Sequence, residues 1–198
     1  MKALPPFGDR RCWRVGLLGG SFNPAHDGHR HISVEALKRL KLDQVWWLVS
    51  PQNPLKPARG MAPLAQRLAA ARTAAHHPRI VVSDIERRLG TVRTLATVRN
   101  LRRRYPRISF VWLMGADNLA QMPHWWRWRE IYRAVRVAVF DRSPYSYRAQ
   151  AGSAAQAFAN KRRESRRLWR TGPPAWTWMA IRRHPASATA LRAAAPNL

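Results

Sequence analysis

Two histidines and a pair of glycines are the residues of this chain whose types and spacing best suit chemistry. They lie in the segment Gly19-Gly20-Ser21-Phe22-Asn23-Pro24-Ala25-His26-Asp27-Gly28-His29. Adjacent glycines let the backbone approach a bulky anionic ligand without a Cβ collision. The helix expected to begin here offers free N–H groups and the positive end of a dipole, where phosphate binds. Both histidines can point toward that phosphate, so the segment predicts a phosphate site.

Two other interpretations of this segment stay open. His26, His29 and His31 could ligate a metal ion, although no cysteine and no second histidine cluster accompanies them at ligand spacing. Alternatively, the segment could be an ordinary turn that ends in a helix cap.

A parallel sheet covered by helices is the architecture expected to position the segment. Apolar runs typical of buried strands occupy residues 13–18, 45–49, 80–82, 108–113, 135–140 and, as a short sixth run, 176–180. Helices are expected at residues 29–40, 63–75 and 94–104, with Thr94 as a cap. This alternation predicts an α/β fold, a Rossmann-like doubly wound parallel sheet flanked by helices. Such sheets bind ligands at the carboxyl ends of strands, where the strand order reverses.

The composition is that of one folded domain. The chain has 198 residues, 46% of them hydrophobic and 23% charged, so we expect a single domain over 1–198. Within it we expect an N-terminal extension (1–12), a loop with one helix (143–171) and a short C-terminal helix (186–198). Its one cysteine excludes an internal disulfide and a thiolate metal site. No run approaches the roughly 18 apolar residues of a membrane span, and no secretory signal is evident, so we expect a cytoplasmic protein without a membrane partner.

Positive charge is the unusual feature of the composition. The chain carries 36 Lys and Arg against 10 Asp and Glu, a formal net charge of +26. Such a field attracts polyanions, so a basic nucleic-acid-binding module is a candidate from a different functional class. The densest clusters, at 102–104 and 161–167, lie in predicted helices, where charged runs usually form a solvated face. We therefore expect no specific nucleic-acid partner.

The segment from Gly19 to His29 resembles the His-x-Gly-His signature of the nucleotidylyltransferase superfamily. The match is His26-Asp27-Gly28-His29. In that superfamily the two histidines hold the triphosphate of ATP and stabilise charge as the α-phosphate is attacked. The resemblance therefore implies the same roles for His26 and His29.

Residues 15–192 further resemble the nicotinate-nucleotide adenylyltransferase family of NAD biosynthesis. The family loop after the second strand is similar to Val49-Ser50-Pro51-Gln52-Asn53-Pro54-Leu55-Lys56, which assigns Lys56 to the phosphates. After the third strand the family has a Tyr-Thr pair and then Asp-Thr-Leu. Here Thr94 is retained, whereas Arg93 and Ala96 replace the aromatic residue and the acid.

Three more segments carry the resemblance. The Gly-x-Asp and Trp motifs correspond to Met114-Gly115-Ala116-Asp117-Asn118-Leu119 and to Trp125-Trp126-Arg127-Trp128. An Arg-Pro-Gly element corresponds, imperfectly, to Asp141-Arg142-Ser143-Pro144-Tyr145, and the second ATP motif to Ala186-Ser187-Ala188-Thr189-Ala190-Leu191-Arg192. By this resemblance Trp125 flanks the nicotinate ring and Arg192 reaches a β- or γ-phosphate. We expect Trp126 and Trp128 to pack in the core.

The resemblance implies adenylyl transfer from ATP to nicotinate mononucleotide, giving deamido-NAD and pyrophosphate. The attacking phosphate oxygen is already ionised at pH 7, so the site must supply alignment and charge neutralisation rather than a general base. The catalytic residues expected are His29, His26 and Lys56. The ATP contacts expected are Gly19, Gly20, Ser21, Phe22, His26, His29, Gly115, Asp117, Ser187, Thr189 and Arg192. The mononucleotide contacts expected are Asn23, Lys56, Thr94, Trp125 and Arg142. We expect no metal site formed by the protein, because Mg²⁺ would enter with ATP and bridge its phosphates.

Several alternatives stay open at this point. A sister adenylyltransferase acting on nicotinamide mononucleotide or phosphopantetheine would share the ATP motifs. The replacements at Arg93 and Ala96 would also suit a weakly active or repurposed member. The partners expected are the two small-molecule substrates, and the protein is expected to be a monomer or homodimer.

Overall fold

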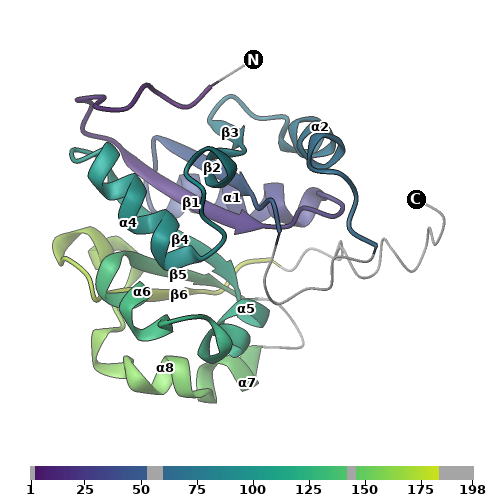
Figure 1. Ribbon diagram of the computed structural model, residues 1–198. Coiled ribbons are helices and arrows are strands. Elements are labelled where there is room, and N and C mark those ends of the chain that lie inside the picture. The colour runs from purple at the N-terminus through teal and green to yellow at the C-terminus, as the bar shows by residue number, and fades with distance from the viewer. Residues whose placement is uncertain (1–2, 53–59, 142–145, 183–198) are drawn as a thin grey trace.

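A computed structural model describes residues 3–52, 60–141 and 146–182 of the chain. Six strands form one sheet in the order β3-β2-β1-β4-β5-β6, and every neighbouring pair is parallel (Figure 1). The strands are β1 (Arg14–Gly20), β2 (Gln44–Val49), β3 (Ile80–Ser83), β4 (Ser109–Gly115), β5 (Arg136–Phe140) and β6 (Trp176–Met179). The predicted doubly wound parallel sheet is therefore confirmed, and its strand order reverses between β1 and β4.

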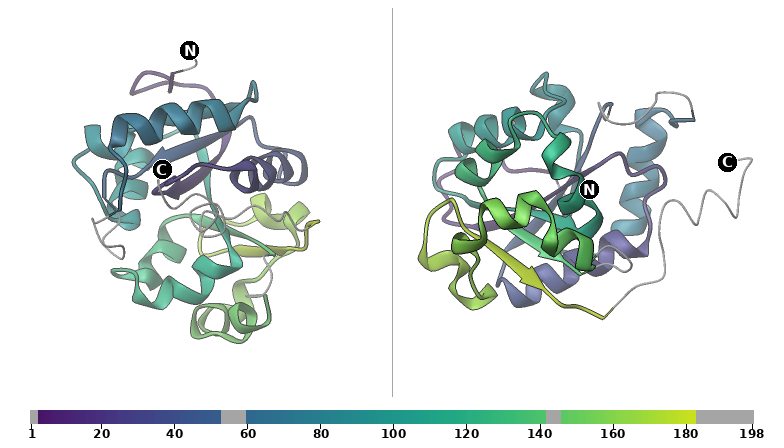
Figure 2. Two further views of the ribbon diagram at one scale, coloured as in Figure 1. Left: turned by 90° about the vertical axis from the view of Figure 1, so that its right-hand side faces the viewer. Right: turned by 90° about the horizontal axis from the view of Figure 1, so that it is seen from below.

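Helices cover both faces of this sheet (Figure 2). The longer ones are α1 (Asp27–Arg39), α2 (Leu64–Ala75) and α4 (Thr94–Arg104), and the shorter ones before β5 are α3 (Ile85–Arg88), α5 (Ala116–Gln121), the 3-10 turn η1 (Met122–His124) and α6 (Trp128–Ala134). Alternate residues of β2 belong to two different core clusters. Trp46 packs with the apolar residues of α4 and α6, whereas Trp47 packs with those of α1 and α2. This period of two is what a strand buried on both faces produces.

The segment after β5 differs from the expected loop with one helix. It forms α7 (Ser146–Ala151), α8 (Ser153–Ala157) and two 3-10 turns, η2 (Ala159–Lys161) and η3 (Ser165–Arg170). The basic run within it is not α-helical, because its backbone is tied to β6. Arg162 forms an isolated bridge with Trp176, and the N–H of Arg163 donates to the carbonyl oxygen of Trp176 at 2.8 Å.

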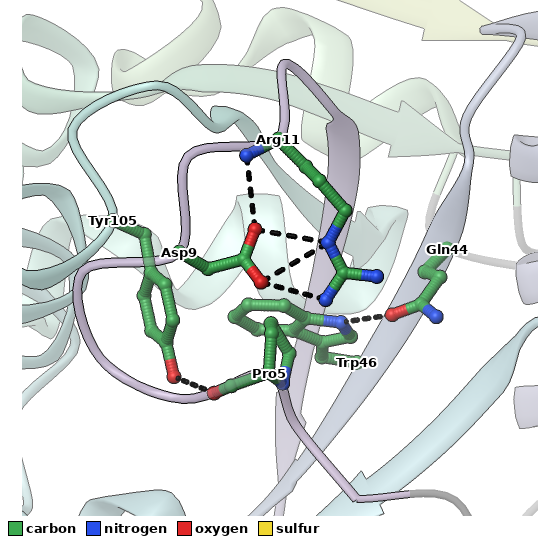
Figure 3. A network of polar contacts seen from close by, with 6 residues as sticks. All are labelled: Pro5, Asp9, Arg11, Gln44, Trp46 and Tyr105. Carbon is green, nitrogen blue, oxygen red and sulfur yellow. Dashed lines mark hydrogen bonds and ion pairs between the residues drawn. The ribbon is translucent and has the colours of Figure 1, made fainter.

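The chain before β1 lies against the amino edge of the sheet, where Figure 3 shows its polar contacts. The hydroxyl of Tyr105 donates to the carbonyl oxygen of Pro5 at 2.8 Å, and Phe7 packs edge-on against the ring of Tyr105. Asp9 and Arg11 form an ion pair within the same stretch. The described part of this extension is therefore anchored at the edge opposite the carboxyl ends of the strands.

None of the helices in the described ranges has the length and apolar character needed to cross a membrane.

Candidate active site

His26 and His29 cap the start of α1, because the Nδ1 atom of each ring accepts a backbone N–H group there. The Nδ1 atom of His26 accepts from the N–H of Gly28 at 3.1 Å, and the Nδ1 atom of His29 accepts from the N–H of His26 at 3.2 Å. The centroids of the two rings lie 3.9 Å apart. A neutral imidazole whose Nδ1 accepts a hydrogen bond carries its proton on Nε2. The helix start thus selects, in both histidines, the tautomer with the donor on Nε2.

The interpretation of this segment as a helix cap is therefore right, and it is compatible with a phosphate site. The capping bonds use the Nδ1 atoms, whereas a phosphate oxygen would accept from Nε2. The metal interpretation has no such support. Across 3–52, 60–141 and 146–182 no three His, Cys, Asp or Glu side chains are grouped to hold a metal ion. His31 lies elsewhere, with its Nε2 atom 2.6 Å from the carbonyl oxygen of Arg182.

An aromatic stack supports the ring of His29. Phe22 is buried, and its ring centroid lies 4.7 Å from that of His29 and 5.1 Å from that of Trp47. The Nε1 atom of Trp47 in turn donates to the hydroxyl of Ser33 at 2.8 Å, and that hydroxyl donates to the carbonyl oxygen of His29. Phe22 has a left-handed backbone, with φ of 48°, a conformation costly for a bulky side chain. Its side chain packs in the core against the rings of Trp47 and His29, and the prediction that Phe22 contacts ATP stays a prediction.

The two glycines before this loop have different reasons to be glycine. A Cβ atom on Gly19 would come within 2.5 Å of the Trp112 ring, so the packing between β1 and β4 excludes a side chain there. A Cβ on Gly20 would meet only Phe22, at ordinary contact distance. Packing against Trp112 is therefore one reason for glycine at position 19, and the prediction that Gly19 and Gly20 both contact the ligand stays a prediction.

Arg67 is a residue of the site region that the sequence analysis missed. Its side chain is buried and donates to four carbonyl oxygens, with distances between 2.7 and 2.9 Å. These carbonyls belong to two loops: Ser21 lies in the loop after β1, whereas Ser50, Pro51 and Ala62 lie in the connection between β2 and α2. One guanidinium of α2 therefore holds together the loops that follow β1 and β2. A signal was present, because Arg67 falls on the same helix face as the buried Leu68 and Ala71.

Asn23 joins the same loop system. Its Nδ2 atom donates to the carbonyl oxygen of Gly60 at 2.9 Å, and its Oδ1 atom accepts from the N–H of Ala62 at 3.2 Å. Ser21 is also buried. The residues predicted from the segment after β1 thus lie together, at the carboxyl end of β1.

Gly115 and Asp117 lie at the carboxyl end of the neighbouring strand. Gly115 is the last residue of β4 and the N-cap of α5, and Asp117 belongs to the first turn of that helix. Because β1 pairs with β4 in parallel, these residues and the histidine segment share one edge of the sheet. This is the edge at which the strand order reverses, as expected for a ligand site.

A buried acid anchors the loop that leads to Thr94. Glu86 accepts from the hydroxyl of Thr97 at 2.9 Å, and Thr97 lies 2.9 Å from the hydroxyl of Thr91. Burial raises the pKa of Glu86, against the opposing effect of the hydrogen bond from Thr97. The backbone N–H of Thr91 also donates to the carbonyl oxygen of Glu86. This network holds the chain just before α4 in a defined position.

The expectation that Thr94 caps α4 is wrong. The N-cap is Arg93, which has the extended backbone of that position (φ −118°, ψ 127°) and makes no side-chain cap bond. Of the tryptophans, Trp128 is in the core as predicted, whereas Trp126 is 45% exposed and the prediction for it is wrong. Trp125 is partly buried and packs against the core.

Five predicted site residues lie outside the described residues: Lys56, Arg142, Ser187, Thr189 and Arg192.

Comparisons with known proteins agree on one class. A cytidylyltransferase-like family model matches residues 17–194. The chain is 55% identical over 179 residues to a Cereibacter sphaeroides protein named probable nicotinate-nucleotide adenylyltransferase, covering 90% of this chain and 96% of that one. It is 58% identical over 144 residues to a protein of the same name from Parvibaculum lavamentivorans, covering 73% and 72%.

Solved structures show a similar fold at low sequence identity. The nicotinic acid mononucleotide adenylyltransferase of Plasmodium falciparum, complexed with NaAD, superposes with a TM-score of 0.66 at 12% identity. The same protein complexed with APC gives a TM-score of 0.65 at 12% identity. Each match covers 91% of this chain and 83% of that one.

Proposed function

Because the chain belongs to the cytidylyltransferase-like family and, within it, to the nicotinate-nucleotide adenylyltransferases, we propose that it transfers the adenylyl group of ATP to nicotinate mononucleotide. The products are deamido-NAD and pyrophosphate, and the step belongs to NAD biosynthesis. The observation that carries the proposal is the His26–His29 pair at the start of α1, whose Nδ1 atoms accept backbone N–H groups. Two imidazole Nε2 donors at a helix start suit a polyphosphate.

The reaction needs charge stabilisation more than proton transfer. A phosphate oxygen of the mononucleotide attacks the α-phosphorus of ATP, and the bond from that phosphorus to the bridging oxygen breaks as pyrophosphate leaves. The attacking oxygen is already ionised at pH 7, so no general base is required. His29 is the first candidate to donate to the α-phosphate as charge develops there, and His26 is the second. Lys56 and Arg192 would neutralise the leaving pyrophosphate.

ATP acts as its complex with a divalent cation, and we propose Mg²⁺. Such a cation would enter with the nucleotide and would help to neutralise the charge of its phosphates. This agrees with the described residues near the histidines, because the imidazole Nε2 atoms of His26 and His29 would donate to phosphate oxygens.

The remaining residues have supporting roles in this proposal. Gly20, Ser21, Gly115 and Asp117 would contact ATP near the point where the strand order reverses. Thr94 and Trp125 would contact the mononucleotide, with Trp125 beside the nicotinate ring. Arg67 acts on the site indirectly, because it holds the carbonyl of Ser21 and with it the loop that leads to the histidines. We propose the cytoplasm as the location, since both substrates are phosphorylated metabolites, and a monomer or homodimer as the assembly.

Pyrophosphate release is the measurement that tests the proposal. The purified chain is given ATP with nicotinate mononucleotide, nicotinamide mononucleotide or phosphopantetheine, and with DNA alone as a control. We expect the highest kcat/KM with nicotinate mononucleotide and none with DNA. A higher value with either other acceptor would replace the proposed substrate. Absence of release with all three would reject adenylyl transfer.

A further inference from the structure

Arg93 and Trp126 make a contact that the proposed function does not use. The guanidinium carbon of Arg93 lies 4.9 Å from the centroid of the Trp126 ring. Both side chains are exposed to solvent. Such a contact between a cation and the face of an aromatic ring is favourable and limits the directions in which the cation can point.

The contact lies at the same edge of the sheet as the histidine pair. Helix α4 leads into β4 and helix α6 leads into β5, so each helix begins near the carboxyl edge and ends near the amino edge. Their ends confirm this parallel arrangement, because the Nη1 atom of Arg102 donates to the carbonyl oxygen of Ala134 at 2.7 Å. The Arg93–Trp126 contact joins their starts in the same way.

Each member of the pair is the chain neighbour of a residue proposed to contact the mononucleotide. Arg93 precedes Thr94, and Trp126 follows Trp125. The contact therefore shows that the segments carrying Thr94 and Trp125 lie close together, and that a guanidinium is held between them. Arg93 also stands where the family resemblance leads one to expect an aromatic residue.

Arg93 differs from the neighbouring arginines in its ion pairing. Arg127 lies over the same ring, with its guanidinium carbon 5.4 Å from the centroid, but it forms an ion pair with Glu130. Arg99 shares that carboxylate. In the described part of the chain Arg93 has no ion pair with an Asp or Glu side chain. Its charge is held in position by an aromatic ring, and none of the acids in the described ranges forms an ion pair with it.

We propose that Arg93 is a specificity-determining residue that selects an acceptor with a carboxylate on its pyridine ring over the neutral amide. The inference rests on the proposed function and deepens it. A carboxylate accepts charge-assisted hydrogen bonds from a guanidinium, whereas the amide gains little from the same group. Trp126 is a positioning residue, because it holds the guanidinium without contacting the acceptor.

The test compares two acceptors in matched variants. The ratio of kcat/KM for nicotinate mononucleotide to that for nicotinamide mononucleotide is measured in the native chain, in Arg93→Gln and in Arg127→Gln. We expect Arg93→Gln to lower the ratio about 10- to 100-fold, the range that one charge-assisted interaction provides. The loss should appear as a higher KM for the acid, with the KM for ATP unchanged. Arg127→Gln removes the same charge from the same ring, and we expect its ratio to stay within about twofold of the native value.

Two outcomes would overturn the role of Arg93, and a third would overturn that of Trp126. An unchanged ratio in Arg93→Gln would remove the role of Arg93. Equal losses in Arg93→Gln and Arg127→Gln would show that the diffuse positive field favours the acid. An unchanged ratio in Trp126→Leu would remove the positioning role of Trp126, for which we expect a smaller loss than in Arg93→Gln. A failure of the proposed function is distinguished from these, because the native chain itself would then release no pyrophosphate with either mononucleotide. Since all three side chains are exposed, far-ultraviolet circular dichroism is expected to confirm a native fold in each variant.

Discussion

The guanidinium of Arg67 donates from Nη1 to the carbonyl oxygen of Ser21 at 2.7 Å, although 46 positions separate the two residues in the chain. Ser21 follows the glycine pair and precedes the histidine segment. A residue of α2 that is remote in sequence thus determines where the loop after β1 lies. Because that loop leads directly to His26, Arg67 links the stability of the fold to the geometry of the site.

Replacing Arg67 should therefore affect stability and ATP binding together. Arg67→Met leaves four carbonyl oxygens without their donor, and we expect the free energy of unfolding to fall by about 2–4 kcal/mol. The KM for ATP should rise, and Arg67→Lys should recover part of both losses. Urea denaturation and ATP titration measure the two effects. Arg72→Met, an exposed arginine of the same helix, is the control, and an equal loss in that variant would contradict the assignment.

Substitutions of His26 and His29 should separate the catalytic role of the pair from its role in capping α1. His29→Ala should lower kcat about 100- to 1000-fold, as the loss of one preorganised donor does, and His26→Ala should have a similar but smaller effect while also weakening ATP binding. His26→Ala also removes the cap of α1, which costs about 1 kcal/mol of stability. His26→Asn restores a side chain that accepts from the N–H of Gly28 but lacks an Nε2 donor, so it should regain stability without regaining kcat.

Single-turnover kinetics and thermal denaturation of these variants provide the comparison. Near-normal kcat in His29→Ala would reject its proposed role. Recovery of kcat in His26→Asn would show that His26 contributes only as a cap.

Thr94→Ala and Trp125→Ala should raise the KM for the mononucleotide more than the KM for ATP. The reason is their place at the start of α4 and before α6, apart from the loop that carries the histidines. Steady-state kinetics with each substrate varied in turn measures the two constants. A selective loss of ATP affinity would show that the two substrates are placed the wrong way round.

The clustered arginines of α4 should matter little for adenylyl transfer. Arg102 and Arg103 line a cavity beside the amino ends of β4 and β5, at the edge of the sheet opposite the histidines. Replacing Arg102, Arg103 and Arg104 together by Gln should therefore leave kcat/KM nearly unchanged at physiological salt, whereas Arg192→Gln should lower it. Equal losses would indicate that the overall positive field binds the substrates.

DNA association should weaken steeply with salt, because log K falls by about 0.9 per phosphate neutralised. A sequence-specific complex at physiological salt would contradict the expected absence of a nucleic-acid partner.

The buried carboxyl of Glu86 should make stability depend on pH. Burial raises its pKa in the folded protein above the usual value of 4.5. As pH rises through 4.5 the unfolded chain ionises first, so the folded state loses relative stability until pH exceeds the raised pKa. In Glu86→Gln no carboxyl titrates at this position, so this loss of stability is absent. Urea denaturation from pH 4 to pH 8 should show the native chain declining relative to the variant, and a difference that does not vary with pH would contradict the assignment.

Local patterns in the sequence were enough to predict most of the sheet and the histidine pair. The apolar runs of β1, β2, β4 and β5 are strong because these strands are buried on both faces, and His26 and His29 act within four residues of one another. The role of Arg67 could not be predicted in this way, since its four partners come from two loops that meet only in the folded chain. Trp126 was misassigned for the same reason. Trp126 precedes Arg127, which adopts a left-handed backbone (φ 50°) without being glycine, so no turn residue in the sequence marked the change of direction before α6.

The two edge strands of the sheet determine whether a second molecule can pair with it. A second molecule can add a strand only where an outer strand presents a long row of unpaired backbone groups. Here the outer strands are β3 and β6, with four residues each, and the first residue of β6 already engages Arg162 and Arg163. An edge strand of four residues offers few backbone N–H and C=O groups with which an incoming strand could pair. The described sheet is thereby protected against edge-to-edge aggregation, even though the strands inside it are among the most apolar segments of the chain.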